Sequence, residues 1–105
     1  MEQVQDLRGK VYNLVVVLLD RNSSTKVLNK VLDILYSVGG IEEYKHTDLK
    51  LQDENQVILA TRLYTLVLSK VDSLIKSTEQ EVSDDIIINA LIEIYETISL
   101  YKRVI

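Results

Sequence analysis

The chain has 105 residues, with no cysteine, no proline and three glycines, a composition that fits one helical domain because Gly and Pro break helices. The lack of cysteine excludes disulfides, thiolate metal sites and cysteine nucleophiles. The net charge is −4, and residues 51–105 account for all of it, so we expect no nucleic-acid partner, which would require a basic surface.

The N-terminal residues are acidic and polar, so we expect no signal peptide, which would begin with basic residues and an apolar core. The longest apolar run, residues 14–19, has six residues, whereas a membrane-spanning helix needs about 20. We therefore expect a soluble protein that is able to touch a membrane surface without crossing it.

A first helix is predicted over residues 3–20, where apolar side chains recur at three- and four-residue steps. The positions on this face are Val4, Leu7, Val11, Leu14, Val15 and Leu18. Apolar residues also occupy positions 16, 17 and 19, which predicts that the end of the helix is buried on more than one side. Gly9 lies in the first half of this helix, where it costs about 1 kcal/mol relative to alanine.

A second helix is predicted over residues 25–38, with Ser23 or Ser24 as the N-cap. Its predicted core stripe consists of Leu28, Val31, Leu32, Leu35 and Val38, with Val27, Ile34 and Tyr36 beside it. Gly39 and Gly40 are expected to end the helix by supplying a left-handed residue. Residues 41–52 show no sustained period and predict a loop, held to the core by Ile41, Tyr44, Leu49 and Leu51.

A third helix is predicted over residues 53–76, with two acidic residues at its positive end. One face consists of Val57, Ala60, Tyr64, Val67, Val71 and Leu74, and an adjacent face consists of Leu59, Leu63 and Leu66. Two neighbouring apolar faces are typical of a helix that is central to a bundle.

A fourth helix is predicted over residues 84–102, with Ser83 as the N-cap and Val82 and Ile87 placed for a hydrophobic staple. Its main face consists of Ile87, Leu91, Ile94, Ile98 and Tyr101, and its second face consists of Ile88, Ile92 and Tyr95. Four helices with short connectors predict a single all-α domain over residues 1–105, an antiparallel up-down four-helix bundle.

No catalytic constellation is recognisable. His46 is the only histidine, and its neighbouring loop carboxylates do not have the spacing of a metal site, so we expect an exposed loop residue. Glu93 and Glu96 lack the Glu-x-x-His pattern of bundle metal sites, and the serines at 69, 73 and 77 have no base arranged beside them. We therefore expect no enzymatic activity, no metal or cofactor and no small-molecule substrate.

Residues 25–36 resemble the second helix of the pediocin-like (class IIa) bacteriocin immunity proteins. The order of the later segments is similar too: a variable loop, a long helix around residues 58–68, a polar connector with a Ser83 cap and an acidic start, and a last helix around residues 88–95. The resemblance covers roughly residues 10–98 and consists of length, helix order and apolar spacing.

The resemblance implies a cytoplasmic protein, peripheral at the inner membrane face, that protects a Gram-positive cell from a pore-forming peptide. Its implied partner is a sugar permease of the mannose phosphotransferase type with the bacteriocin bound. In the family, recognition is attributed to the C-terminal half, which here implies the outer side of the third helix, the connector and the chain end. The implied recognition residues are Glu79, Glu81, Asp84, Asp85, Tyr101, Lys102 and Arg103.

Two other hypotheses stay open from the sequence. One is a small helical interaction or assembly subunit without catalysis, such as a homodimer that uses an exposed apolar stripe or a component of a larger complex. The other is an enzyme, which the absence of an assembled site disfavours. A bacteriocin survival assay tests the immunity hypothesis, and a concentration-dependent mass in solution tests the homodimer.

Overall fold

The computed structural model describes residues 3–39 and 54–104, with side chains from residue 7 onward in the first range. These residues form four helices: α1 Gln3–Asp20, α2 Thr25–Gly39, α3 Glu54–Ser77 and α4 Asp84–Val104. The predicted all-α class is confirmed, and every helix boundary lies within two residues of its prediction. The expected loop at residues 41–52, its anchoring residues and His46 lie outside the described residues.

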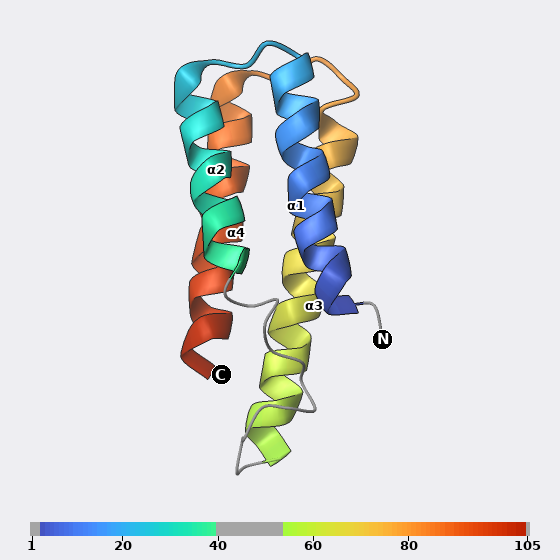
Figure 1. The fold of residues 1–105 in the computed structure, drawn as a ribbon, viewed down its shortest axis with the longest axis vertical. Helices are drawn as coiled ribbons and strands as arrows, with labels where there is room; N and C mark the ends of the chain where they lie inside the picture. The colour runs from blue at the N-terminus through green and yellow to red at the C-terminus, as the bar shows by residue number, and fades with distance from the viewer. Residues whose placement is uncertain (1–2, 40–53, 105) are drawn as a thin grey trace.

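The helices form a four-helix bundle about 44 Å long and 20 Å across. Figure 1 shows α1 and α2 on one side of the bundle and α3 and α4 on the other, with the two hairpin connections together at the upper end. Helix α1 packs on α2 and α3, and α4 packs on α2 and α3. Direction alternates along the chain, so the hairpin partners are antiparallel, whereas α1 with α3 and α2 with α4 run in parallel (Figure 1).

Among the described residues, the buried apolar side chains are aliphatic except for two tyrosines, and each helix contributes one stripe of them. The buried apolar residues are Leu7, Val11, Leu14, Val15 and Leu18 of α1; Val27, Val31, Ile34 and Val38 of α2; Ala60, Tyr64, Val67, Val71 and Leu74 of α3; and Ile87, Leu91, Ile94, Ile98 and Tyr101 of α4. For α1 and α4 the main predicted faces are confirmed, apart from Val4, whose side chain lies outside the described residues.

The predicted core stripe of α2 is only partly correct: Val31 and Val38 are buried as predicted, but the buried face is rotated about the helix axis relative to the prediction. Leu32, placed in the stripe, is 49% exposed, while Val27 and Ile34, placed beside it, are buried. Leu28 and Leu35 are only half-buried against the core, and Tyr36 is exposed. Apolar residues at helical spacing form two adjacent stripes on this helix. The sequence period does not indicate which stripe is buried, and the packing of α2 against α1 and α4 determines it.

The wide apolar faces predicted for the other helices are also narrower than expected. In α3, Leu59 and Leu66 are exposed, Leu63 is only half-buried, and Val57 is exposed because the first turns of α3 extend beyond α1 at the lower end (Figure 1). At the end of α1, Val16 and Leu19 are exposed, and in α4 Ile92 and Tyr95 are exposed. A square bundle buries one stripe per helix, so a second apolar stripe faces outward.

The turn between α1 and α2 combines a C-cap with an N-cap. Asn22 has a left-handed backbone with φ 62°, the amide of Ser23 donates to Leu18 O, and the amide of Asn22 donates to Leu19 O. This pairing of six-to-one and five-to-two bonds is a Schellman motif, in which asparagine tolerates the left-handed position. Ser24 then caps α2, since its Oγ accepts from the Val27 amide at 3.4 Å. Of the two N-cap candidates, Ser24 therefore holds the role.

Gly9 offers a direct test of helix propensity. It is exposed inside α1, and a Cβ added there meets no heavy atom within 4 Å. We expect Gly9→Ala to raise the free energy of unfolding by about 1 kcal/mol, because alanine loses less conformational entropy on folding. Chemical denaturation measures the change.

The matched control for Gly9→Ala is Gly39→Ala, since a Cβ at Gly39 also meets open space. Gly39 is the last residue of α2 and does not have a positive φ, and Gly40, the other residue expected to supply the left-handed conformation, lies outside the described residues. We expect a smaller gain at this helix end than in the interior of α1. A loss of stability in Gly9→Ala would contradict an open, regular helix at this position.

Candidate functional site

The acidic connector between α3 and α4, residues 78–83, is held in a defined conformation. At the end of α3 the amides of Glu79 and Gln80 donate to the carbonyls of Lys76 and Ser77, each at 3.1 Å, which tightens the last turn. The Thr78 hydroxyl donates to Ile75 O at 2.6 Å. The connector therefore leaves α3 through hydrogen-bonded turns.

The start of α4 is capped as the sequence predicts. Ser83 Oγ accepts from the Ile86 amide at 3.3 Å, and Asp84 and Asp85 occupy the first turn, where the helix dipole favours negative charge. Val82 is half-buried against the core and Ile87 is buried, which agrees with the predicted staple positions. These contacts fix the direction in which the chain enters α4.

Arg21 joins the two connections at this end of the bundle. Its Nη2 donates to Val82 O at 2.9 Å across 61 residues of sequence, and its side chain is half-buried. A charge-assisted hydrogen bond to a carbonyl is worth about 1.5–3 kcal/mol when it is shielded from water. No local sequence pattern signals this contact, because its two partners are 61 residues apart.

The predicted recognition residues do not form one surface. Glu79, Glu81 and Asp85 are exposed and Asp84 is half-buried at the upper end, whereas Lys102 and Arg103 are exposed near the end of α4. Asp84 and Lys102 are 18 positions apart on one helix, a separation of about 27 Å at 1.5 Å per residue. The acidic and basic groups therefore lie at opposite ends of the bundle, so no single small partner contacts both.

Tyr101 belongs to the core and is not part of an exposed chain end. It is 1% exposed, and its ring packs on that of Tyr64 with the centroids 5.7 Å apart and the planes tilted by 48°. Tilted aromatic pairs of this kind add about 0.5–1.5 kcal/mol beyond the area they bury. Burial raises the pKa of Tyr101 to about 12. As a correction to the implied recognition set, this side chain is not accessible to a partner.

Charged side chains connect three pairs of neighbouring helices across the outside of the bundle. Lys10 pairs with Asp72 at 2.8 Å between α1 and α3, and Lys70 pairs with Glu93 at 3.0 Å between α3 and α4. Lys102 donates to Ser37 O at 3.3 Å, from α4 to α2. Exposed ion pairs contribute about 0–1 kcal/mol each, so they orient the helices more than they stabilise them.

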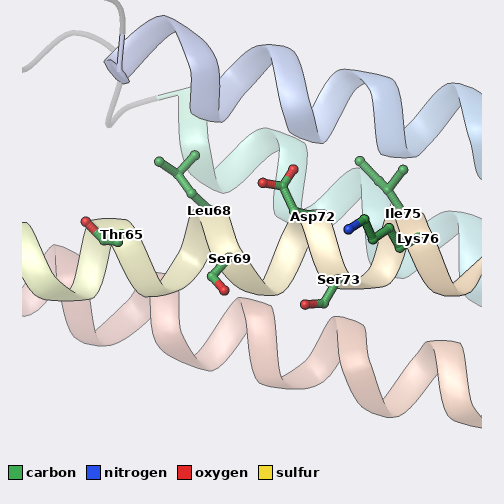
Figure 2. A pocket seen from close by; sticks show the side chains of 7 residues that line it. All are labelled: Thr65, Leu68, Ser69, Asp72, Ser73, Ile75 and Lys76. Carbon is green, nitrogen blue, oxygen red and sulfur yellow. The ribbon is translucent and has the colours of Figure 1, made fainter.

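A shallow hollow lies along the outer face of α3 and is lined by Thr65, Leu68, Ser69, Asp72, Ser73, Ile75 and Lys76. Figure 2 shows these side chains spread around the helix, with Leu68, Asp72 and Ile75 directed toward α1 and Ser69 and Ser73 toward α4. They do not converge on a common point, and Asp72 is already paired with Lys10. Ser69 and Ser73 are exposed and therefore lie on a solvated edge of α3.

The described residues assemble no metal site: within residues 3–39 and 54–104 no three His, Cys, Asp or Glu side chains gather around a point where an ion would bind. Glu93, which the sequence places near Glu96 on α4, is engaged with Lys70. Among the four helices described, none combines the length and hydropathy needed to cross a membrane.

The fold defines the chain as an all-α four-helix-bundle protein. Comparison with known proteins adds no narrower class, since no known protein family, no curated protein and no solved structure matches the chain.

Proposed function

We propose that the chain acts by binding a membrane protein complex, as an immunity protein against a class IIa bacteriocin. The single observation that carries this is the α3–α4 hairpin, whose acidic connector is exposed yet held by the Ser83 cap and by Arg21. Groups that are already ordered lose little entropy on binding, so such a connector is well suited to recognition. The resemblance of residues 10–98 to this family in helix order and apolar spacing is the second ground for the proposal.

The proposed partner is the sugar permease of the mannose phosphotransferase type with the bacteriocin bound. The chain would bind this complex at the inner face of the membrane. Glu79, Glu81 and Asp85 present negative charge at one end of the bundle, and the matching surface on the partner is therefore basic. Complementary charges of this kind mainly raise the association rate and make binding salt-dependent. The basic end at Lys102 and Arg103 faces away from that contact.

Expression in a bacteriocin-sensitive host tests the function. We expect the wild-type chain to raise survival against one or a few class IIa peptides, and Glu79→Gln/Glu81→Gln to reduce that protection about tenfold, equivalent to a loss of about 1.4 kcal/mol in binding. The matched control is Asp33→Asn/Glu96→Gln, which also removes two exposed carboxylates but from the middle of the bundle. We expect this control to protect like the wild type.

Two outcomes count against these assignments. If the folded, abundant wild-type chain gives no protection against a broad panel of class IIa peptides, the immunity function is wrong. If the connector variant and its control protect equally well, the function stands without the connector, and recognition takes place elsewhere on the bundle.

A further inference from the structure

The outer side of the α1–α2 hairpin carries the two most exposed large apolar side chains of the described residues. Tyr36 is 91% exposed, Tyr12 59%, Leu19 55%, and Val16 and Leu32 49% each. These five residues form the α1–α2 outer face. Positions 12, 16 and 19 lie on one side of α1, and positions 32 and 36 lie on one side of α2, as four- and three-residue steps require. Half-buried Leu28 and Leu35 connect this face to the core.

The five side chains of this face are uncharged, and the nearest charged residue before them on the same side of α1 is the exposed Arg8, one turn before Tyr12. Residues 12–19 of α1 contain no Lys, Arg, Asp or Glu. Within residues 28–36 of α2 the charged residues are Lys30 and Asp33, and both line a hollow against α4 instead. The three other neighbouring helix pairs are bridged by the Lys10, Lys70 and Lys102 contacts. A monomer in water has no need of five apolar side chains here, because the core is complete without them.

We propose that a second copy of the chain docks on the α1–α2 outer face, hairpin against hairpin, about a two-fold axis. In such an interface the same patch faces itself, so it must be self-complementary. An apolar face meets this requirement, and its five side chains add no like-charge repulsion between two copies, although each chain carries a net charge of −4.

The available area fits a weak dimer. An aromatic side chain buries about 150–250 Å² when it is fully covered. The five side chains of the face, each exposed by about half or more, therefore present on the order of 500 Å² of apolar surface per chain. Two copies then bury roughly 1,000 Å² in total, close to the lower limit for a specific interface. We therefore expect dissociation constants on the order of micromolar.

The dimer does not depend on the proposed immunity function. Docking through α1 and α2 leaves the outer side of α3 and α4, with its hollow of serines, open to other partners (Figures 1 and 2). A chain that dimerises without protecting a host, or protects without dimerising, separates the two proposals.

Sedimentation equilibrium over a range of protein concentrations tests the dimer. We expect the wild-type mass to rise from 12.0 kDa toward twice that value. Leu32→Glu and Tyr36→Glu, each placing a charge near its own copy across the axis, are expected to weaken the dimer at least tenfold. Both side chains are exposed, and Tyr36 is so exposed that its replacement leaves the fold intact, which circular dichroism verifies.

Leu100→Glu is the matched control, because Leu100 is 48% exposed on α4, almost the same as Leu32 on α2. A dimer that persists in this variant and is lost in both face variants supports the proposal. The proposal is overturned by a wild-type chain that stays monomeric at every concentration, by a dimer that survives Leu32→Glu and Tyr36→Glu, or by a dimer that Leu100→Glu disrupts equally.

Discussion

Ile34→Ala is expected to lower the free energy of unfolding by about 2–5 kcal/mol, whereas Leu32→Ala, two residues away, is expected to change it by less than about 1 kcal/mol. Ile34 is 1% exposed within the α2 core stripe, and its truncation removes buried methyl groups and leaves a cavity. Leu32 is half-exposed, so its truncation opens no cavity. Urea denaturation at a concentration where the chain is monomeric measures both values.

The comparison between these two variants is informative because the same helix carries both residues. Helix propensity changes little and in the same direction in both, since each gains an alanine. The difference therefore reports which side of α2 faces the core. If Leu32→Ala costs as much as Ile34→Ala, or more, α2 is rotated toward the stripe that the sequence pattern predicts, and the burial of Ile34 in the core is wrong.

The rotation of α2 shows where sequence reasoning reaches its limit in this chain. Leu28, Leu32 and Leu35 recur at helical spacing, as do Val27, Val31, Ile34 and Val38, so the helix has two overlapping apolar stripes. The period predicts a helix but does not choose between the stripes. In α4 the polar residues Asn89, Glu93 and Glu96 occupy the side opposite the main face, and the predicted burial of that main face is correct, although the second predicted face is not.

Local signals predicted the ends of the helices well. Ser24 and Ser83 are capping residues whose hydroxyls accept amides three residues ahead, an interaction that depends on the adjacent sequence alone. The contacts that hold the hairpins together depend on distant residues: Lys10 with Asp72, and Arg21 with the carbonyl of Val82. Neither pair leaves a periodic trace in the sequence, and only the assembled bundle brings them together.

The candidate site was predictable in its parts but not in its arrangement. The acidic start of α4 and its basic end were both placed in the implied recognition set, yet a helix of 21 residues holds them far apart. Tyr101 was interpreted both as a core-face residue and as part of an exposed end. Its helical spacing from Ile94 and Ile98 correctly predicted that Tyr101 is buried, because the helix continues to Val104 and keeps this position facing the core.

Because Tyr101 is buried, the free energy of unfolding is expected to fall as the pH becomes alkaline. Burial raises its pKa from 10.0 to about 12, because the phenolate is poorly solvated in the core. Below pH 10 the ring is neutral in both the folded and the unfolded chain, and its contribution is fully present. Between pH 10 and 12 the unfolded chain loses this proton while the folded chain keeps it, so stability falls with rising pH. We expect a loss of roughly 1–3 kcal/mol from this residue.

Denaturation at a series of pH values, repeated for Tyr101→Phe and Tyr36→Phe, isolates that contribution. Phenylalanine at position 101 cannot ionise, so the loss of stability between pH 10 and 12 is expected to be smaller in this variant by the same roughly 1–3 kcal/mol. Tyr36→Phe is the matched control, because it also removes one tyrosine hydroxyl but from an exposed position on α2, and the measurements are made at a concentration where the chain is monomeric. If the Tyr101→Phe curve has the same alkaline slope as the wild type, the ring at position 101 ionises as readily in the folded chain as in the unfolded one and is not buried against Tyr64.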